Sequence, residues 1–282
     1  MGQLIDGKAI AEKIRNSIAL EVRKLKKKNI QPKLGVVLVG NDMPSQTYVG
    51  KKQQAAEAAG IDFVLKKFPT SVSKNKLIAE IKNIQKKEKL SGLIIQLPLP
   101  DKLYTSEVIN AVDPKIDVDC LTDANIGKLV MRTNYIFPPT PFAVIAILKE
   151  LNFEVAGKNI TIVGMGALVG KPLAIILSNA GASVITCNSR TKDTKEKCLM
   201  ADVIVTGVGK KDLLRGDMVK PGAIVIDTGI VFENGKMFGD ANREEVLSKA
   251  SYFTPTPGGV GPITVALLLQ NTVLCAKHNS KK

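Results

Sequence analysis

Apolar positions recur every three or four residues over 7–29, a spacing that predicts a helix with one buried face. The spaced apolar residues are Ile14, Ile18, Val22 and Leu25. A short apolar run over 34–39 follows and ends at Gly40 and Asn41, which is typical of a buried strand bounded by a turn. The chain is therefore predicted to open with a helix and then a strand.

The same alternation continues to residue 97. Further helices are predicted near 45–59 and 74–87, and further strands near 63–68 and 92–97. Strands that alternate with helices pair in parallel through right-handed crossovers. Residues 1–139 are therefore predicted to form one α/β domain.

A second alternating series follows the stretch Pro138-Pro139-Thr140-Pro141, where missing amide donors and fixed φ angles disfavour a continuing helix. It starts with a helix to Leu151, and helices then separate predicted strands near 159–163, 183–187, 203–206 and 223–226. This pattern indicates a Rossmann-like dinucleotide-binding domain over 140–262. The last helix, within 263–282, is too isolated to form a domain and is expected to pack back on the first one.

The composition is that of an ordinary soluble protein, with 282 residues, 45% hydrophobic and 23% charged, and the length predicts about two domains. His278, the one histidine, lies near the C-terminus, where a frayed tail is expected, so a histidine-based catalytic triad is excluded. The four cysteines are too widely spaced for a zinc site, and no dedicated metal centre is expected. Without a secretory signal or a long apolar run, the chain is predicted to be cytoplasmic, with no membrane partner and with reduced thiols.

A formal net charge of +14 raises the alternative of a basic protein that binds anions or nucleic acid without catalysis. The excess is spread over both halves of the chain. Its densest part, Lys24 to Lys28, closes the first predicted helix, where cations suit the negative end of the helix dipole. With few aromatic residues for base stacking and no nucleic-acid-binding motif, no nucleic-acid partner is expected, although attraction of small polyanions is retained. Salt-sensitive duplex binding without NADP binding would favour the non-enzymatic alternative.

A glycine-rich turn gives the cofactor signal. The predicted strand at 160–163 is followed by Gly164-Met165-Gly166-Ala167-Leu168-Val169-Gly170 and then a helix, so backbone amides there can approach a pyrophosphate. The glycine spacing has one residue more than the usual fingerprint, and an ordinary strand-to-helix turn stays a second reading. After the next strand come Ser189, Arg190 and Lys192 with no carboxylate to receive ribose hydroxyls, which favours the 2′-phosphate of NADP over solvated loop cations.

Two segments of the first domain carry polar chemistry. In the segment 39–52, Tyr48 and Lys52 are four residues apart and share a helix face if the helix begins at Ser45. In the segment 92–100, Gln96 interrupts an apolar strand near its C-terminal end, where open α/β sheets place ligands. A buried amide needs partners, and Lys52 is a candidate.

These segments, together with the string Thr254-Pro255-Thr256-Pro257-Gly258-Gly259-Val260-Gly261-Pro262, resemble the bifunctional methylenetetrahydrofolate dehydrogenase/methenyltetrahydrofolate cyclohydrolase family over essentially the whole chain. The resemblance implies NADP-dependent oxidation of 5,10-methylenetetrahydrofolate, then hydrolysis of the methenyl product to 10-formyltetrahydrofolate. It also implies tetrahydrofolate derivatives as ligands, bound in a cleft between two α/β domains, and a homodimer.

By position in the family's strings, Lys52 matches the catalytic lysine, Gln96 the glutamine that tunes it, and Tyr48 the tyrosine that lies against the aminobenzoyl ring. Asp119 matches the aspartate that holds the pterin. The loops that resemble the cleft lining are Pro98-Leu99-Pro100 and Pro257-Gly258-Gly259. Family positions near the nicotinamide cofactor fall on Thr140, Gly164, Ile230 and Thr264.

Several positions depart from the family pattern. Ile116 and Cys120 stand where lysine and glycine flank the Asp-Val-Asp motif, so a differently shaped loop is expected there. Met165-Gly166 replaces an Arg-Ser pair and removes one expected phosphate contact, which weakens the preference for NADP over NAD. The other departures are Pro139, Asn188 and Thr256. The alternatives are a family member with one activity or a preference for NAD, and another two-domain NAD(P) dehydrogenase of the shikimate or amino-acid type.

Overall fold

The computed structural model describes residues 2–280, and the chain divides into two units. Unit 1 is Met1–Ala11 with Thr140–Thr264, and unit 2 is Glu12–Pro139 with Val265–Lys282. The division falls within two 20-residue helices, α1 (Gly7–Lys26) and α10 (Val260–Asn279). Both units are α/β, as the sequence predicts.

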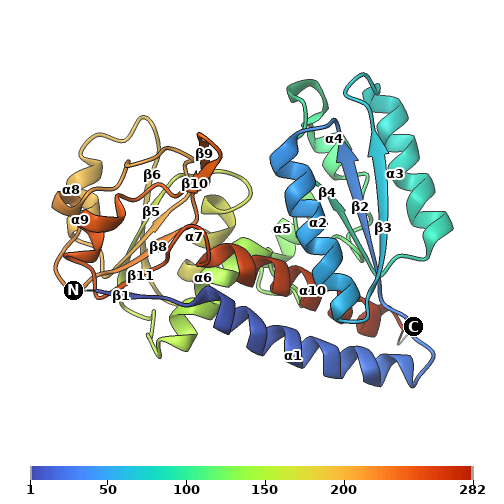
Figure 1. The fold of residues 1–282 in the computed structure, drawn as a ribbon, viewed down its shortest axis with the longest axis horizontal. Coiled ribbons are helices and arrows are strands. Elements are labelled where there is room, and N and C mark those ends of the chain that lie inside the picture. Colours follow the sequence, from blue (N-terminus) through green and yellow to red (C-terminus); the bar gives the residue numbers. More distant parts are fainter. Residues whose placement is uncertain (1, 281–282) are drawn as a thin grey trace. The chain divides into compact units, whose positions relative to one another are not determined.

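Unit 2 is built on a parallel sheet of three strands in the order β3-β2-β4 (Figure 1). The strands are β2 (Lys33–Val39), β3 (Asp62–Phe68) and β4 (Gly92–Ile95), and the helices that connect them are α2 (Met43–Ala58) and α3 (Lys74–Glu88). The alternation predicted for this region is confirmed. Strand β4 ends at Ile95, however, so Gln96 follows the strand instead of interrupting it.

Two apolar layers cover the sheet of unit 2. On one face, Val36 and Leu38 pack with α1, α2 and the C-terminal part of α10. On the other face, Val37 and Val39 pack with α3 and the short helix α4 (Ser106–Ile109). Neighbouring residues of β2 point to opposite faces, and both sets are buried, which explains the continuous apolar run of this strand. The remaining elements are η1 (Asp101–Leu103) and α5 (Asp123–Val130).

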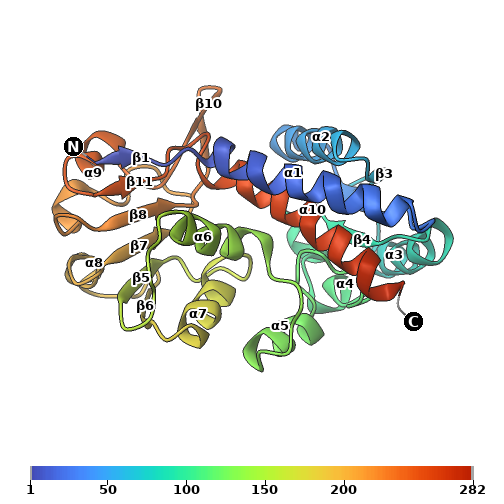
Figure 2. The ribbon, with the colours of Figure 1, turned by 90° about the horizontal axis from the view of Figure 1, so that it is seen from below.

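The C-terminal helix packs into unit 2, as expected, but it is not frayed at His278. The His278 ring stacks on Tyr135 with centroids 4.3 Å apart, and within the helix Leu268, Leu269 and Val273 are buried in the core. The aromatic contact and the apolar face hold the last turn in place. By length and composition α10 could cross a membrane, but most of its apolar window is buried, as in the core helix of a soluble protein. Helices α1 and α10 run side by side here, linked by Lys277 and Glu21 (Figures 1 and 2).

Unit 1 has a parallel six-stranded sheet in the order β1-β11-β8-β7-β5-β6 (Figure 2). Its central strands are β5 (Asn159–Val163), β6 (Ser183–Cys187), β7 (Val203–Thr206) and β8 (Ile224–Asp227). The chain leaves β5 toward β6 on one side and later returns to β7 on the other. This reversal is the topological switch point at which doubly wound sheets bind dinucleotides.

Helices and a hairpin complete unit 1. They are α6 (Pro139–Glu150), α7 (Gly170–Asn179), α8 (Thr194–Leu199), η2 (Gly216–Met218), α9 (Arg243–Leu247), β9 (Val231–Glu233) and β10 (Lys236–Phe238). Helix α6 begins inside the proline-dense stretch, since Pro139 occupies its first position and lacks only an amide that a helix start leaves unpaired.

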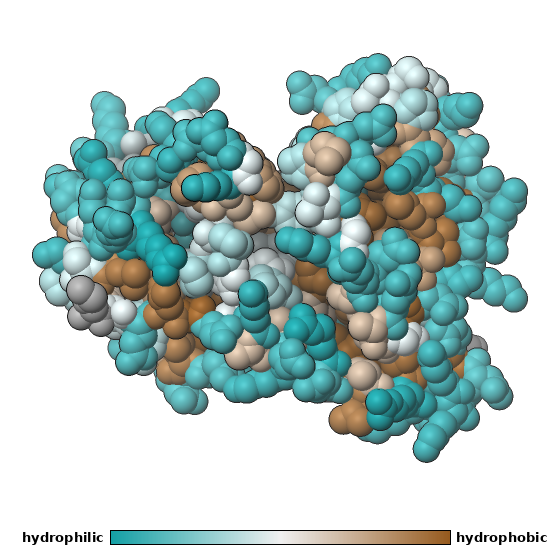
Figure 3. Space-filling model, viewed as in Figure 1, coloured by the Kyte–Doolittle hydropathy of each residue, from teal (hydrophilic) through white to brown (hydrophobic). Residues whose placement is uncertain are grey.

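The N-terminal residues differ from the predicted division of the chain. Strand β1 (Gln3–Leu4) pairs in parallel with β11 (Tyr252–Phe253), so the first residues join the sheet of unit 1 and not the domain predicted over 1–139. A two-residue strand has too short a pattern to be seen in the sequence. On the face visible in Figure 3, hydrophilic side chains dominate and apolar ones show between them on both units.

Candidate active site

A lysine and an amide meet at the carboxyl end of the sheet of unit 2. Helix α2 starts after β2, where the Asp42 side chain accepts a hydrogen bond from the Ser45 amide at 2.9 Å. Further along this helix, Lys52 Nζ donates to Gln96 Oε1 at 2.9 Å. The predicted contact between Lys52 and Gln96 is confirmed, and Tyr48 lies one helical turn before Lys52 on α2.

Gln96 is held in one orientation. It is 8% exposed, its backbone amide donates to the Val37 carbonyl at 2.8 Å, and its Nε2 donates to the Leu97 carbonyl at 2.6 Å. Because the amide nitrogen is engaged by a carbonyl, the oxygen is the atom that faces Lys52. The amide is therefore a fixed acceptor for the ammonium.

Lys52 and Asp119 form a half-buried pair of interacting titratable groups. Burial lowers the pKa of the Lys52 ammonium below its ordinary value, and the charge of Asp119 opposes that shift. Burial also raises the pKa of the Asp119 carboxyl to about 6, with Lys52 opposing and Asp117 adding to the rise. Burial likewise raises the pKa of the Tyr48 phenol. A lysine whose pKa is lowered and a carboxyl group whose pKa is raised exchange protons with a ligand more readily than the same groups in water.

The loop that carries Asp119 is fixed by its neighbours. Asp117 is 3% exposed and accepts from the amide and the hydroxyl of Thr122, at 2.9 and 2.7 Å, and from Asn125 Nδ2 at 3.0 Å. Asn271 on α10 donates to the Val118 carbonyl at 2.8 Å. The loop backbone around Asp119 is thus held in place, and the Asp119 carboxylate interacts electrostatically with Lys52.

Cys120, which departs from the family's glycine, has a buried thiol and φ of +55°. A left-handed backbone at this position is what glycine adopts most easily. Cys120 therefore occupies a left-handed turn although it is not glycine, and the expectation of a differently shaped loop stays a prediction.

The segment Pro98-Leu99-Pro100 has a mixed character. Pro98 is exposed after a cis peptide bond from Leu97, and the Pro100 carbonyl accepts from the Leu103 amide at 2.7 Å. Leu99 is 7% exposed and packs in the apolar core beside α3. The Leu99 side chain anchors the segment in the core, so within Pro98-Leu99-Pro100 only the two prolines are available to contact a ligand.

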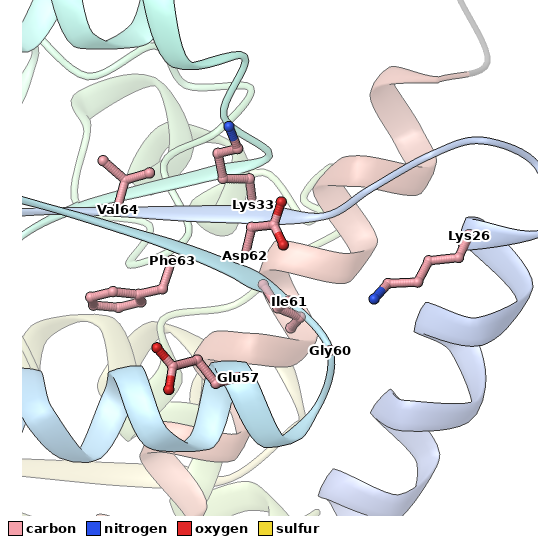
Figure 4. A pocket seen from close by; sticks show the side chains of 8 residues that line it. All are labelled: Lys26, Lys33, Glu57, Gly60, Ile61, Asp62, Phe63 and Val64. Atoms are coloured by element: carbon pink, nitrogen blue, oxygen red, sulfur yellow. The ribbon is translucent and has the colours of Figure 1, made fainter.

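A hollow in unit 2 lies away from these residues. It has a volume of about 470 Å³ and is lined by residues at the ends of α1 and α2 and at the start of β2 and β3 (Figure 4). The cations Lys26 and Lys33 are balanced there by the carboxylates Glu57 and Asp62. This is the amino end of the strands, opposite to Gln96, and its side chains present no common charge to a ligand.

Glycines shape the turn after β5 in unit 1. Gly164 has φ of +108°, and a Cβ on it would lie 2.5 Å from the Gly207 carbonyl oxygen of the loop after β7. A Cβ on Gly170, at the start of α7, would lie 1.9 Å from the Gly164 carbonyl oxygen. Only glycines allow these three segments to approach so closely. The result is a strand-to-helix cradle at the switch point, with Met165 half-buried and Gly166 exposed beside it.

The loop after β6 presents cations without a carboxylate. Asn188 Oδ1 accepts from the Arg190 amide and Thr191 Oγ1 accepts from the Asn188 amide, each at 2.9 Å. The loop is therefore shaped by its own side chains, while Ser189, Arg190 and Lys192 are exposed. A guanidinium in this place suits a 2′-phosphate, whereas a carboxylate would suit free ribose hydroxyls.

The remaining predicted cofactor and loop residues also lie in unit 1. Thr140 Oγ1 and Thr264 Oγ1 are 3.3 Å apart, although 124 positions separate them in the sequence. Ile230 follows β8 and is 42% exposed. The loop Pro257-Gly258-Gly259 precedes α10, and its Gly259 amide donates to the Pro255 carbonyl at 2.8 Å. The structure brings the threonines together and leaves Ile230 open to solvent.

Sequence reasoning missed the buried polar groups that support these loops. Asn271, Asp227 and Asp240 are 5%, 2% and 0% exposed, and every one of them hydrogen-bonds backbone groups. Asp227 could have been noticed, because it ends an apolar strand. Asp240 and Asn271 lie 30 and 153 positions from backbone groups they bind, so no local pattern marks them.

Comparison with known proteins supplies an independent test. The family described as "Tetrahydrofolate dehydrogenase/cyclohydrolase, catalytic domain" matches residues 5–119, and "Tetrahydrofolate dehydrogenase/cyclohydrolase, NAD(P)-binding domain" matches residues 138–280. The "Bifunctional protein FolD" of Aliarcobacter butzleri is 46% identical over 281 residues, which cover 99% of this chain and 98% of that protein.

Solved structures agree. The bifunctional FolD enzyme of Campylobacter jejuni is 40% identical with a TM-score of 0.95, and the match covers 99% of this chain and 100% of that one. The Trypanosoma brucei methylenetetrahydrofolate dehydrogenase-cyclohydrolase, solved with NADP cofactor and an inhibitor, is 33% identical with a TM-score of 0.95, and the match covers 100% of this chain and 99% of that one.

Proposed function

Since this chain belongs to the tetrahydrofolate dehydrogenase/cyclohydrolase family, we propose that the Lys52–Gln96 pair and Asp119 carry its folate chemistry and that the glycine turn of unit 1 holds NADP. The enzyme oxidises 5,10-methylenetetrahydrofolate to 5,10-methenyltetrahydrofolate and then hydrolyses this product to 10-formyltetrahydrofolate. The alternatives of an unrelated dehydrogenase and of a binding protein without catalysis are set aside, because both family domains match and relatives align over nearly the full chain.

The oxidation step depends on positioning. NADP, when bound, accepts the hydride that the bridging methylene carbon loses. The residues fit this cofactor: Gly164, Gly170 and Gly207 let the segments of the turn pack closely together, and a Cβ on the exposed Gly166 would meet no atom within 4 Å, so the backbone there is open to a pyrophosphate. Arg190 is exposed where a 2′-phosphate would lie. In unit 2, Asp119 would accept hydrogen bonds from the pterin and Tyr48 would lie against the aminobenzoyl ring. The cation formed at the methylene carbon is stabilised by its two nitrogens, so the step needs no strong base.

The hydrolysis step needs a proton acceptor. Water attacks the methenyl carbon, and the attacking water must lose a proton as the new C–O bond forms. The Lys52 amine, with its pKa lowered by burial, takes this proton in its neutral form. Gln96 holds the lysine through the 2.9 Å hydrogen bond. The resulting ammonium then returns its proton to the ring nitrogen as the C–N bond breaks, while the hydroxyl group on the carbon loses its proton to solvent and becomes the formyl carbonyl, so the hydrolysis releases one proton overall.

The single observation that carries the assignment is the contact between Lys52 Nζ and Gln96 Oε1, between residues 44 positions apart that the family's strings single out. The test is a spectrum of the purified protein with methylenetetrahydrofolate, recorded with NADP and with NAD in parallel. NADPH absorbance should rise first and methenyl absorbance should stay low as it is hydrolysed. Accumulating methenyl absorbance would indicate a single-activity enzyme, equal rates would contradict the NADP preference, and no cofactor reduction would refute the assignment.

The proposal includes a cytoplasmic homodimer. All four cysteines are buried and unpaired with one another, in accord with a reducing compartment. Strand β3 forms an edge of its sheet and carries a run of half-buried residues, and symmetric dimers are the commonest oligomers. Light scattering coupled to gel filtration measures the assembly directly, and a monomer mass at micromolar concentration would contradict it.

A further inference from the structure

Two buried carboxylates lie at the carboxyl end of the unit 1 sheet, and the chemistry described above uses neither. Asp240 follows the β9–β10 hairpin and is 0% exposed. Asp227 is the last residue of β8 and is 2% exposed. Burying a carboxylate costs free energy unless hydrogen-bond donors surround it. The donors around each carboxylate therefore show which parts of the backbone it fixes in place.

Asp240 binds the loop that follows β7. Its Oδ2 accepts from the Val208 amide at 2.6 Å, and its Oδ1 accepts from the Lys210 amide at 2.8 Å. The residue between them, Gly209, has φ of +75°. The Asp240 carboxylate thus accepts hydrogen bonds from the backbone amides on both sides of a left-handed residue and fixes the shape of the turn.

Asp227 binds the neighbouring loop after β8. Its Oδ1 accepts from the Gly229 amide at 2.9 Å and from Thr206 Oγ1 at 3.0 Å, and its Oδ2 accepts from the Ala241 amide at 2.9 Å. Gly229 lies so close to Asp240 that a Cβ there would be 2.3 Å from Oδ1. The two loops and the two carboxylates therefore form one packed arrangement.

The loop after β7 belongs to the switch point. Gly207 starts it, and its carbonyl oxygen is the atom that a Cβ on Gly164 would meet at 2.5 Å. The two loops also expose apolar side chains, since Val208 is 47% exposed and Ile230 is 42% exposed. Exposed apolar groups beside a dinucleotide cradle offer a surface for the flat rings of a cofactor.

We propose that Asp240 is a positioning residue for NADP: through its two hydrogen bonds, Asp240 holds the Gly207–Lys210 turn in the shape that the cofactor binds. The inference rests on the proposed function. Asp227, at the end of β8, supports the same arrangement, because it accepts a hydrogen bond from the backbone amide of Ala241, the residue after Asp240. Burial raises the pKa of Asp227 to about 6, an effect to which the adjacent Asp240 contributes.

Asp240→Asn tests the role while keeping the side-chain size. An amide can accept from Val208 or from Lys210 but turns its NH₂ group toward the other donor. We expect the dissociation constant and the KM of NADP to rise about tenfold with a much smaller change in kcat, the loss of about one buried hydrogen bond. Hydrolysis of added methenyltetrahydrofolate, which consumes no NADP, should stay within about twofold of the wild-type rate.

The matched control is Asp202→Asn at the other end of the same sheet. Asp202 accepts from the Asn159 amide at 3.0 Å and pairs with Lys220 at 2.7 Å, so its loss costs stability as well. NADP affinity should not change in this variant. If calorimetry shows equal NADP affinity for wild type and folded Asp240→Asn, or an equal loss in Asp202→Asn, the positioning role is wrong.

A second pair of variants covers the case in which Asp240→Asn does not fold. Gly209 and Gly222 both have positive φ angles and room for a methyl group, with the nearest atom to a new Cβ 3.7 Å away for Gly209 and none within 4 Å for Gly222. Gly209→Ala should weaken NADP binding, and Gly222→Ala should affect stability alone. Unchanged NADP binding in Gly209→Ala overturns the inference, whereas a wild-type enzyme that fails to reduce NADP overturns the proposed function instead.

Discussion

Asp117 and Asp119 are two residues apart on one loop, yet their surroundings differ, and so do the roles that their carboxylates can have. Asp117 accepts from the backbone and side chains of its own loop and the following helix, so its oxygens are occupied. Asp119 is half-buried and interacts electrostatically with Lys52, and burial raises its pKa to about 6. A buried carboxylate thus supports structure when local donors satisfy it and is available for chemistry when they do not.

Lys52→Met is expected to have the largest effect. Removing the amine removes the proton acceptor for hydrolysis, so the cyclohydrolase rate should fall by about 10³-fold, while oxidation persists at a reduced rate. The measurement is the decay of methenyl absorbance. The neighbouring exposed Lys51 offers the control, since Lys51→Met should retain both activities. Full cyclohydrolase turnover in Lys52→Met would refute the assigned role.

Asp117→Ala should act on folding more than on kinetics. It leaves the Thr122 amide and the Asn125 side chain without their buried acceptor, and we expect a loss of about 3 kcal/mol in the stability of unit 2. Urea denaturation followed by the fluorescence of tyrosines reports the change. If the folded variant lost folate affinity without losing stability, the structural assignment of Asp117 would be wrong.

Asp119→Asn should act on binding more than on folding. The neutral amide replaces a charged acceptor, and we expect the KM for methylenetetrahydrofolate to rise about tenfold or more, in keeping with the weakening of one charge-assisted hydrogen bond. Initial rates at varied folate concentration give the value. Asp123→Asn, at an exposed carboxylate on the same segment, provides the comparison and should leave the KM unchanged.

The smallest expected effect is a shift in the pH dependence of the cyclohydrolase rate, which tests the interaction between Asp119 and Lys52. In the proposed mechanism the neutral form of Lys52 accepts the proton, so the cyclohydrolase rate should rise with pH and level off below the ordinary pKa of lysine. The Asp119 charge holds the ammonium form and so raises the pKa of Lys52 against the effect of burial. In Asp119→Asn the midpoint of the pH–rate profile should therefore move to lower pH. A midpoint that moves upward would show that the two groups do not interact as described.

Much of the fold could be predicted because burial imposes a pattern on the sequence. The strands at 159–163, 183–187 and 203–206 are observed at those bounds, since apolar runs flanked by turns leave few alternatives. The β9–β10 hairpin was missed although its turn carries a signal: Asn234 and Gly235 have φ angles of +50° and +73°, as Asn-Gly hairpin turns do. Strands β1 and β11 have two residues each, too few for any period.

The residues of the site likewise fall into those that could be predicted from the sequence and those that could not. Lys52 and Gln96 could be paired from the sequence, because a lysine on a helix and an amide at the end of a strand both reach the carboxyl edge of a parallel sheet. Asp240 and Asn271 could not, because their partners are backbone groups far along the chain. Backbone donors and acceptors exist at every residue, so they leave no mark in the sequence at the position that binds them.

The hydrogen bonds of Asn271 have a consequence for synthesis on the ribosome. This side chain joins the carbonyl groups of Val118 and Phe137, and residues of α10 around it complete the core of unit 2. Translation delivers that helix only after the whole of residues 140–264. Unit 2, most of which is made first, thus stays incomplete until α10 emerges, and a nascent chain stalled before this helix would hold an unfinished unit 2 and a nearly complete unit 1.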